Sequence, residues 1–303
     1  MRKFLLKVIL FFAIVAVLDI GWGTIMDTVL DDTNKGDWGR RNFVVNQTQQ
    51  DVLIFGSSKA LHHYDPQIIA DILQMSCYNC GEDGTGILSQ KPRIDIILER
   101  YKPKIIIYDI IANFDLLDCD NTSFLKILRP FCSSPTVLET MSIIDTNERY
   151  KSLSNFYKYN SSFIEILHQH LLRSTTNAAQ FNYSPLLGVM DYDVPEQFYD
   201  EGHKYDNLKI EYLSKLADAC KKRNVKLIIV ASPWYKMRKS SILAPVENMC
   251  KQKGVVFLNH LFDNEYITNK SLFKDAAHLN KQGAEKWSTQ IGSEIKNTTE
   301  QDM

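Results

Sequence analysis

The sequence predicts an α/β protein: a three-layer sandwich with a mostly parallel five-stranded sheet and a largely helical insertion. Two observations support this fold class. Short runs rich in Ile and Val recur without polar alternation, which is typical of strands that are buried on both faces of a parallel sheet. Segments with apolar residues at helical spacing separate these runs, so that strand and helix alternate along the chain.

The first 26 residues combine a basic start with a long apolar stretch. Three basic residues precede the apolar segment 8–18: Arg2, Lys3 and Lys7. This pattern predicts a membrane anchor or signal segment over 1–26, with its basic end in the cytoplasm and the rest of the chain on the other side. No small-x-small cleavage site follows Leu18, which favours an uncleaved single-pass anchor over a cleaved signal peptide that would release a secreted protein.

Residues 27–50 are polar and lack a sustained period, so we expect a linker there. The strand-like runs follow at 52–55, 76–79, 104–111, 226–231 and 255–259. One helix is expected to begin at Pro66, and a second is expected to end near Tyr101. Further helices are expected over 206–223, over 243–253 and after Asn280.

Residues 116–205 interrupt the alternation of strand and helix. They are rich in Tyr, Phe, Ser and Asn, and helices are expected around 137–144 and 163–173. We therefore interpret 116–205 as an insertion within a folded domain that covers 51–297, followed by a short tail at 298–303.

Composition and charge narrow the possible partners. The chain has 303 residues, 45% of them hydrophobic, and a formal net charge of −1, so it offers no broad positive field and no nucleic-acid partner is expected. The six cysteines form an even set in a chain predicted to be exported, which permits disulfides, and Cys119 with Cys132 is the first pair to test. The CxxC pair at Cys77 and Cys80 lacks further ligands, so no metal site is expected.

The turn Gly56-Ser57-Ser58 follows the first predicted strand. Parallel sheets bind their ligands at the carboxyl ends of the strands, and a hydroxyl at the start of the next helix lies near N–H groups that favour developing negative charge. Ser58 is therefore a candidate nucleophile. The alternative is that these serines only cap a helix, which Ser does often.

Near the C-terminus, Asp275 and His278 lie three residues apart, just before a helix that Asn280 would cap. This spacing lets the carboxylate reach Nδ1 of the imidazole and leaves Nε2 for a serine proton. The pair therefore supplies the base and the orienting acid that a serine nucleophile needs.

With these two blocks, the sequence resembles the SGNH, or GDSL-type, hydrolase superfamily over 51–296. The resemblance implies a flavodoxin-like SGNH fold in which Ser58 is the nucleophile, His278 the general base and Asp275 its orienter. It also implies an oxyanion hole, formed by the N–H groups of Ser58 and Gly84 and the side chain of Asn113. Two departures from the family pattern are visible: Ser57 replaces the acid of the Gly-Asp-Ser block, and no Gly-x-Asn-Asp surrounds Asn113.

An anchored member of this superfamily is most similar to its cell-envelope branch, which includes polysaccharide O-acyl esterases and transferases and the D-alanyl transfer proteins of teichoic acid synthesis. The resemblance implies an extracytoplasmic enzyme of a bacterial envelope that needs no metal or organic cofactor. It would act through an acyl-enzyme on O-acyl groups, such as O-acetyl groups, of a glycan or on a small ester. The alternative is a non-catalytic binding or scaffold partner of a membrane acyltransferase.

Residues near the predicted strand ends have open roles. His62 and His63 follow Ser58 closely, so either binds substrate, replaces His278 as base, is solvent-exposed or packs in the core. Trp234 and Tyr235 follow the fourth strand, and each either stacks on a sugar ring or packs in the core. Lys59 is expected to be a solvated lysine.

Overall fold

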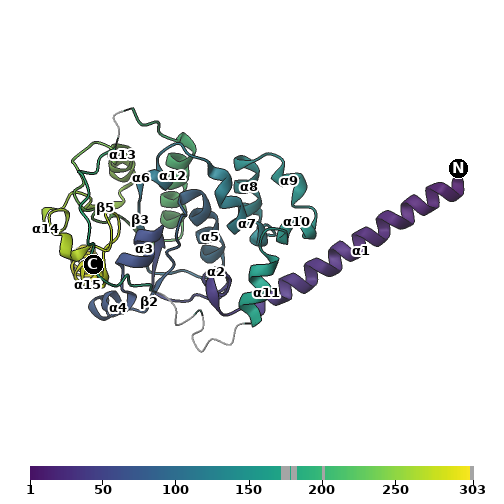
Figure 1. The fold of residues 1–303 in the computed structure, drawn as a ribbon, viewed down its shortest axis with the longest axis horizontal. Coiled ribbons are helices and arrows are strands. Elements are labelled where there is room, and N and C mark those ends of the chain that lie inside the picture. The colour runs from purple at the N-terminus through teal and green to yellow at the C-terminus, as the bar shows by residue number, and fades with distance from the viewer. Residues whose placement is uncertain (172–177, 179–182, 200–201, 301–303) are drawn as a thin grey trace. The chain divides into compact units, whose positions relative to one another are not determined.

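The computed structural model describes residues 1–171, 178, 183–199 and 202–300 (Figure 1). The chain packs as two compact units, here named the sheet unit and the N-terminal unit. The sheet unit consists of Thr48–Asp120 and Asn182–Met303, and the N-terminal unit consists of Met1–Gln47 and Asn121–Phe181. The predicted insertion is thus divided: residues 121–181 pack with the start of the chain, whereas 182–205 belong to the sheet unit.

The sheet unit contains a five-stranded sheet in which every strand pair is parallel, as predicted. Its strands are β1 (Val52–Gly56), β2 (Cys77–Asn79), β3 (Ile105–Asp109), β4 (Lys226–Ala231) and β5 (Val256–Asn259), in the order β2-β1-β3-β4-β5. Val52 of β1 pairs with Cys77 on one side and with Ile105 on the other. The strand order therefore reverses between β1 and β3, the kind of position at which α/β proteins bind ligands.

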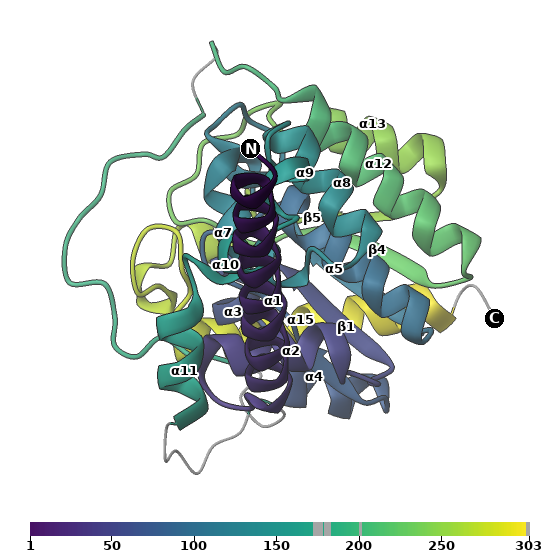
Figure 2. The ribbon, with the colours of Figure 1, turned by 90° about the vertical axis from the view of Figure 1, so that its right-hand side faces the viewer.

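Helices cover both faces of this sheet (Figures 1 and 2). On one face lie α3 (Ser58–His63), α4 (Pro66–Leu73) and α15 (Lys281–Glu300), with Ala60, Ile69 and Trp287 buried against Ile54 and Ile107. On the other face lie α5 (Ile87–Arg100), α12 (Asn207–Lys222) and α13 (Ala244–Lys253), which contact β1, β4 and β5 in that order. The three-layer prediction is confirmed.

The helix signals of the sequence are satisfied by side-chain caps. Asp65 accepts the Gln67 N–H over 2.9 Å at the start of α4, where Pro66 is the first helical residue. Asp206 likewise accepts the Leu208 N–H over 2.9 Å at the start of α12. Two short helices, α6 (Ala112–Asp115) and α14 (Asn264–Ile267), complete the α-helices of this unit within the described residues.

The N-terminal unit is helical. Its α-helices are α1 (Arg2–Asp32), α2 (Gly36–Asn46), α7 (Leu125–Leu128), α8 (Pro135–Ile144), α9 (Glu148–Lys151), α10 (Asn155–Tyr159) and α11 (Phe163–Leu171). The two helices expected in the insertion correspond to α8 and α11, although residues 172–173 lie outside the described residues.

The expected linker over 27–50 is wrong, because most of it is helical in α1 and α2. Trp38 of α2 is fully buried, its Nε1–H donates to Glu165 of α11 over 3.2 Å, and its backbone N–H donates to the Gln169 side chain over 2.7 Å. These contacts come from a segment distant in sequence, and they stabilise a helix that the local sequence does not favour. At the other end of the chain, α15 extends to Glu300 through part of the expected tail.

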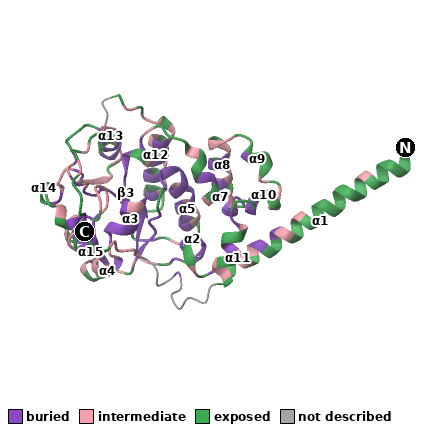
Figure 3. Ribbon diagram, in the orientation of Figure 1, coloured by how far each residue is buried: buried purple, intermediate pink, exposed green. Residues whose placement is uncertain are grey.

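Helix α1 is long and apolar enough to cross a membrane by length and composition, with a mean hydropathy of 2.5 over an 18-residue window. Its N-terminal part is exposed along its length (Figure 3). The Cys132 thiol is free, so the structure does not contain the predicted Cys119–Cys132 disulfide.

Candidate active site

The turn after β1 places Ser58 at the carboxyl edge of the sheet. Gly56 ends β1 with a φ of +140°, and a Cβ at this position would lie 2.5 Å from the Asp109 carbonyl oxygen. Ser57 follows as the N-cap residue of α3, and Ser58 is the first residue of that helix. Ser57 Oγ is buried and makes no hydrogen bond within the described residues, so the capping alternative does not explain either hydroxyl.

Ser58, His278 and Asp275 form a continuous chain of hydrogen bonds. Ser58 Oγ lies 2.8 Å from His278 Nε2, and His278 Nδ1 lies 2.9 Å and 3.0 Å from the two carboxylate oxygens of Asp275. A proton on Nδ1 directed at the carboxylate leaves Nε2 with a lone pair for the serine hydroxyl. The structure therefore brings together the three residues that the two sequence blocks singled out.

The surroundings of Asp275 favour its ionised form. Burial raises the pKa of the Asp275 carboxyl, but the hydrogen bond and charge of His278 together with two backbone N–H groups outweigh this effect and lower the pKa below its usual value. Those N–H groups belong to Ala277 and His278, and each donates to Oδ1 over 2.9 Å. The carboxylate can therefore orient the imidazole and would stabilise an imidazolium there if Nε2 accepted the Ser58 proton.

Two contacts hold the loop that carries His278. The Tyr235 N–H donates to the Ala276 carbonyl oxygen over 2.9 Å, which ties the loop to the segment after β4. The Leu279 N–H donates to His63 Nε2 over 3.0 Å, which ties the loop to α3. The candidate base is thus fixed to the same short helix that carries the candidate nucleophile.

His63 is a buried and neutral part of this support. Because its Nε2 accepts the Leu279 N–H, its ring proton lies on Nδ1, which is 3.1 Å from Ser232 Oγ. Burial lowers the pKa of His63 well below its usual value, and nearby positive charges, first that of Lys59, lower it further. Its ring centroid lies 6.2 Å from that of His278.

Lys59 is buried, so the expectation of a solvated lysine is wrong. Its Nζ donates to the Ser232 carbonyl oxygen over 2.5 Å and lies 5.5 Å from the centroid of the Trp234 ring. Burial lowers the pKa of Lys59 to about 8, although the Asp109 carboxylate opposes this shift. Burial also raises the pKa of Asp109, which accepts a hydrogen bond from the Tyr64 hydroxyl.

His62 lies beside His278, with the ring centroids 5.7 Å apart. Its Nδ1 donates to the Ser184 carbonyl oxygen over 2.6 Å, and its Nε2 lies 3.2 Å from an Asp83 oxygen. The imidazole that contacts Ser58 is that of His278, which argues against His62 or His63 as the base. A contact between His62 and substrate stays a prediction.

Gly84 and Asn113, the predicted oxyanion donors, lie after β2 and β3, the two strands that flank β1. Both residues are exposed, and Gly84 has a φ of +66°. Another glycine of the same loop, Gly81, has a packing role, because a Cβ there would lie 2.4 Å from the Leu61 backbone nitrogen. The roles of Gly84 and Asn113 at an oxyanion stay predictions.

Trp234 and Tyr235 have different surroundings. The Tyr235 ring is 5% exposed and packs against Phe273 at a centroid distance of 5.5 Å, so the structure favours packing over sugar stacking. The Trp234 ring is partly exposed and lies 6.4 Å from that of Tyr199. Tyr199 also borders a cavity of about 530 Å³, which is lined by Phe198, Tyr199, His203, Arg238, Lys239, Ser240 and Ser241.

The sequence did not indicate that four buried side chains support the catalytic candidates: those of His63, Ser232, Asp109 and Tyr64. The one available signal was position, since Ser232 and Asp109 end or follow strands at the edge that carries Ser58. Among the residues that the structure describes, no group of three His, Cys, Asp or Glu side chains is placed to hold a metal ion.

No protein-family model matches this sequence, and no curated protein matches it. Among solved structures, the chain is similar to a protein from Desulfitobacterium hafniense DCB-2 that is described as belonging to the G-D-S-L family of lipolytic proteins. The TM-score is 0.38 at 10% sequence identity, and the match covers 81% of this chain and 99% of the other. At this identity and TM-score, the likeness says nothing about the chemistry of the site in this chain.

Proposed function

We propose that this chain is a serine esterase or acyltransferase that acts on O-acyl groups, such as O-acetyl groups, of a cell-envelope glycan. The observation that carries the proposal is the chain of hydrogen bonds from Ser58 Oγ through both nitrogens of His278 to Asp275. A serine hydroxyl is a weak nucleophile at neutral pH, and a base within hydrogen-bond reach, itself held by a carboxylate, activates it.

In the first half-reaction, Ser58 Oγ attacks the ester carbonyl carbon while its proton passes to His278 Nε2. Negative charge develops on the carbonyl oxygen, and the predicted donors to it are the N–H groups of Ser58 and Gly84 and the Asn113 amide. The C–O bond to the leaving alcohol then breaks, and His278 returns the proton to that alcohol. The product is an ester between the acyl group and Ser58.

In the second half-reaction, water or a sugar hydroxyl attacks the acyl-enzyme. His278 accepts the proton of the attacking oxygen and gives it back to Ser58 Oγ as the ester bond breaks. Attack by water completes an esterase cycle, and attack by a sugar hydroxyl completes a transferase cycle.

Two features support a glycan at the cell envelope as substrate. The partly exposed Trp234 ring and the cavity bordered by Tyr199 offer aromatic and polar surface that suits a sugar. The basic start and apolar length of α1 support a single-pass anchor with both units on the extracytoplasmic side.

Covalent labelling tests the proposal. The full-length protein in detergent is treated with a fluorophosphonate probe, and we expect one modified residue, Ser58. Ser58→Ala should abolish labelling, and His278→Ala should slow it about a thousandfold. Ser57→Ala is the matched control, because the Ser57 hydroxyl makes no hydrogen bond within the described residues and its removal should leave labelling unchanged.

Unchanged labelling in Ser58→Ala, or in a folded His278→Ala variant, would contradict the proposal. A folded wild-type protein that neither reacts with the probe nor cleaves p-nitrophenyl acetate would favour the non-catalytic partner of a membrane acyltransferase. Incubation with an O-acetylated glycan, with and without an added sugar acceptor, separates hydrolysis from transfer, because released acetate and acetylated acceptor are different products.

A further inference from the structure

One face of α1 is built into the N-terminal unit, beginning at Asp19. The Asp19 carboxylate accepts the Ser154 hydroxyl over 2.8 Å and the backbone N–H groups of Asn155 and Phe156 over 2.9 Å each. It also accepts the Asn155 side-chain amide over 3.1 Å. The two backbone N–H groups belong to the first residues of α10, so Asp19 of α1 caps the start of α10. Protein donors therefore fill the hydrogen-bonding capacity of the Asp19 carboxylate.

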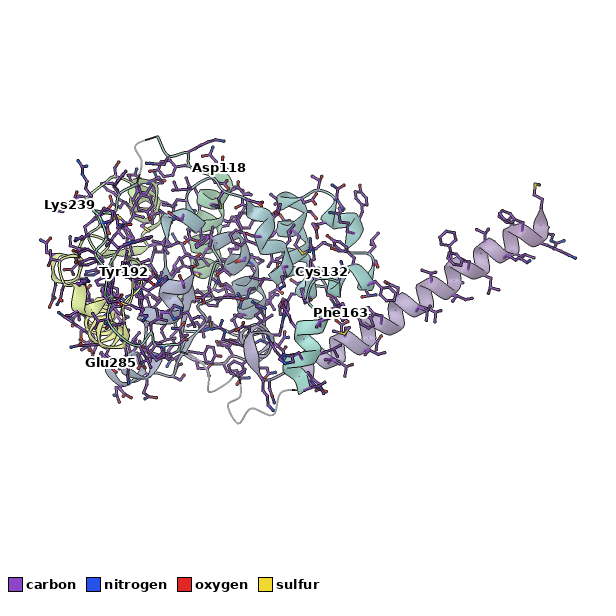
Figure 4. The ribbon with its side chains drawn as sticks, in the orientation of Figure 1. Asp118, Cys132, Phe163, Tyr192, Lys239 and Glu285 are labelled. Carbon is purple, nitrogen blue, oxygen red and sulfur yellow. The ribbon has the colours of Figure 1, made fainter. Side chains whose placement is uncertain are left out.

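The same face of α1 continues with tight packing. The Trp22 ring stacks on Phe156 at 5.7 Å and meets Phe163 edge-on at 5.6 Å. A Cβ on Gly23 would lie 2.4 Å from the Asn155 side chain, so α1 and α10 approach closely there. Farther along, the Asp27 carboxylate lies 2.6 Å from Lys158 Nζ. Figure 4 shows Phe163 at the base of the protruding part of α1.

Apolar side chains remain exposed around this junction. On α1, Ile20 and Ile25 are 62% and 59% exposed, and they extend the apolar surface beyond Asp19. On the neighbouring elements, Leu153 is 81%, Phe156 48% and Ile164 68% exposed. Leu153 precedes Ser154, and Ile164 follows Phe163, so both lie next to residues that contact Asp19 or Trp22.

The length of α1 sets where the bilayer ends. The apolar segment 8–18, which follows the basic residues Arg2, Lys3 and Lys7, spans about 17 Å at 1.5 Å per residue, well short of the roughly 30 Å of a hydrocarbon core. A bilayer that takes up this segment therefore reaches the level of Asp19 and Trp22. A carboxylate facing lipid at that level is costly, but Asp19 faces protein donors instead, and the lipid-facing side chains beside it are apolar.

We propose that the N-terminal unit rests on the membrane through a lipid-contacting surface formed by Leu153, Phe156 and Ile164, together with Ile20 and Ile25. Its partner is the phospholipid bilayer that α1 enters, at the boundary between headgroups and acyl chains. The surface is continuous with α1, and exposed Arg149 and Tyr150, close to Leu153 in sequence, supply the basic and amphipathic side chains that suit a headgroup layer.

Photolabelling from within the bilayer tests this surface. The full-length protein is reconstituted in phosphatidylcholine and phosphatidylglycerol vesicles that contain a phosphatidylcholine with a diazirine in its acyl chain. After illumination, mass spectrometry maps the labelled residues. We expect label on residues 1–18 and, in addition, on Leu153, Phe156 and Ile164.

Leu171 is the internal control on the same helix as Ile164. The Leu171 side chain is 74% exposed, and its neighbour His170 lies 3.4 Å from Thr33. Thr33 lies about 16 Å beyond Trp22 along the axis of α1, so Leu171 is farther from the bilayer than Ile164. It should stay unlabelled. The double variant Leu153→Ser with Ile164→Ser should lower labelling of this surface at least threefold with α1 labelling unchanged, whereas Leu171→Ser should change neither.

Label on residues 1–18 without label on Leu153, Phe156 or Ile164 would overturn the proposal, as would equal label on Ile164 and Leu171. A protein unlabelled throughout would remove the membrane anchor and this surface together. The fluorophosphonate reaction of Ser58 is measured separately in detergent, so failure of the lipid-contacting surface and failure of the catalytic proposal are distinguishable.

Discussion

His62 and His63 are adjacent in sequence, but their surroundings differ. His62 is buried beside His278 and contacts Asp83, whereas His63 is fully buried and holds the loop of the candidate base through the Leu279 N–H. The sequence indicated Ser58, Asp275 and His278 because each belongs to a compact local pattern. It could not indicate this role of His63, because its partner lies 216 positions away and no local spacing encodes that contact.

Replacing His63 tests its role as a positioning residue. His63→Phe leaves the buried Leu279 N–H without an acceptor, which should destabilise the fold by about 1 to 3 kcal/mol and slow fluorophosphonate labelling of Ser58 about tenfold or more. His63→Gln can offer an amide oxygen near the place of Nε2, so it should recover most of the rate. The measurements are thermal unfolding and the labelling rate as a function of pH. Equal rates for the two variants after correction for the folded fraction would contradict this role.

Lys59 should give the protein a distinctive pH dependence. Its pKa is about 8 in the folded chain and 10.5 ordinarily, so between these values the unfolded chain binds a proton that the folded chain does not, and stability rises with pH. Below pH 8 both states are protonated and the contribution is constant. Relative to Lys59→Met, the wild type should gain about 2.5 to 3 kcal/mol between pH 7 and pH 10, because about 2 units of this window lie in that range, at about 1.4 kcal/mol each. Urea unfolding at pH 7 and pH 10 measures it, and an unchanged difference would contradict the prediction.

At the scale of elements, the sheet and its helices were predictable because each has a signal in its local sequence. Parallel strands are continuous apolar runs, and α4 and α12 begin at Asp residues that cap them. Helix α2 was not predictable, because its local sequence is polar and its stability comes from the burial of Trp38 against α11. Tertiary packing of this kind overrides weak local propensity.

The start of α5 depends on a carboxylate from another helix. Asp115 of α6 accepts the Ile87 N–H over 2.7 Å, the Ile111 N–H over 2.8 Å and the Tyr108 hydroxyl over 2.7 Å, all of them buried. Asp115→Ala leaves these three buried donors without an acceptor and should lower the free energy of unfolding by about 3 kcal/mol or more. Asp115→Asn keeps one acceptor oxygen and should cost less. Urea unfolding compares the two, and equal losses would contradict the capping role.

At the scale of the molecule, the chain contributes to the N-terminal unit twice, before and after the first half of the sheet unit. The sequence marked an apolar N-terminus and an interruption at 116–205, but it could not show that part of this interruption packs with α1 and α2. That pairing depends on contacts such as Asp19 with Asn155, which lie 136 positions apart. The alternation of strand and helix indicates which elements follow one another in sequence, but not which distant segments pack together.

Truncation separates the exposed part of α1 from the packed part. Deleting residues 2–18 removes side chains that are exposed apart from Val8, so thermal unfolding in detergent should be unchanged. Deleting residues 2–27 also removes Asp19, Trp22 and the fully buried Met26, and it should destabilise the N-terminal unit by about 3 kcal/mol or more. Equal stability of the two truncated proteins would contradict the packing described for α1.

Helix α1 runs without a break from Arg2 to Asp32, and its second half is fastened to α10 and α11. A chain that leaves a membrane through one continuous helix has no flexible hinge at the membrane surface. If α1 spans a bilayer as proposed, rotation of α1 about its long axis is therefore transmitted to the N-terminal unit attached to it, and the two diffuse together. A fluorophore on the N-terminal unit should show the slow anisotropy decay of a membrane protein. It should lack the fast decay of a domain that is joined to its anchor by a flexible linker.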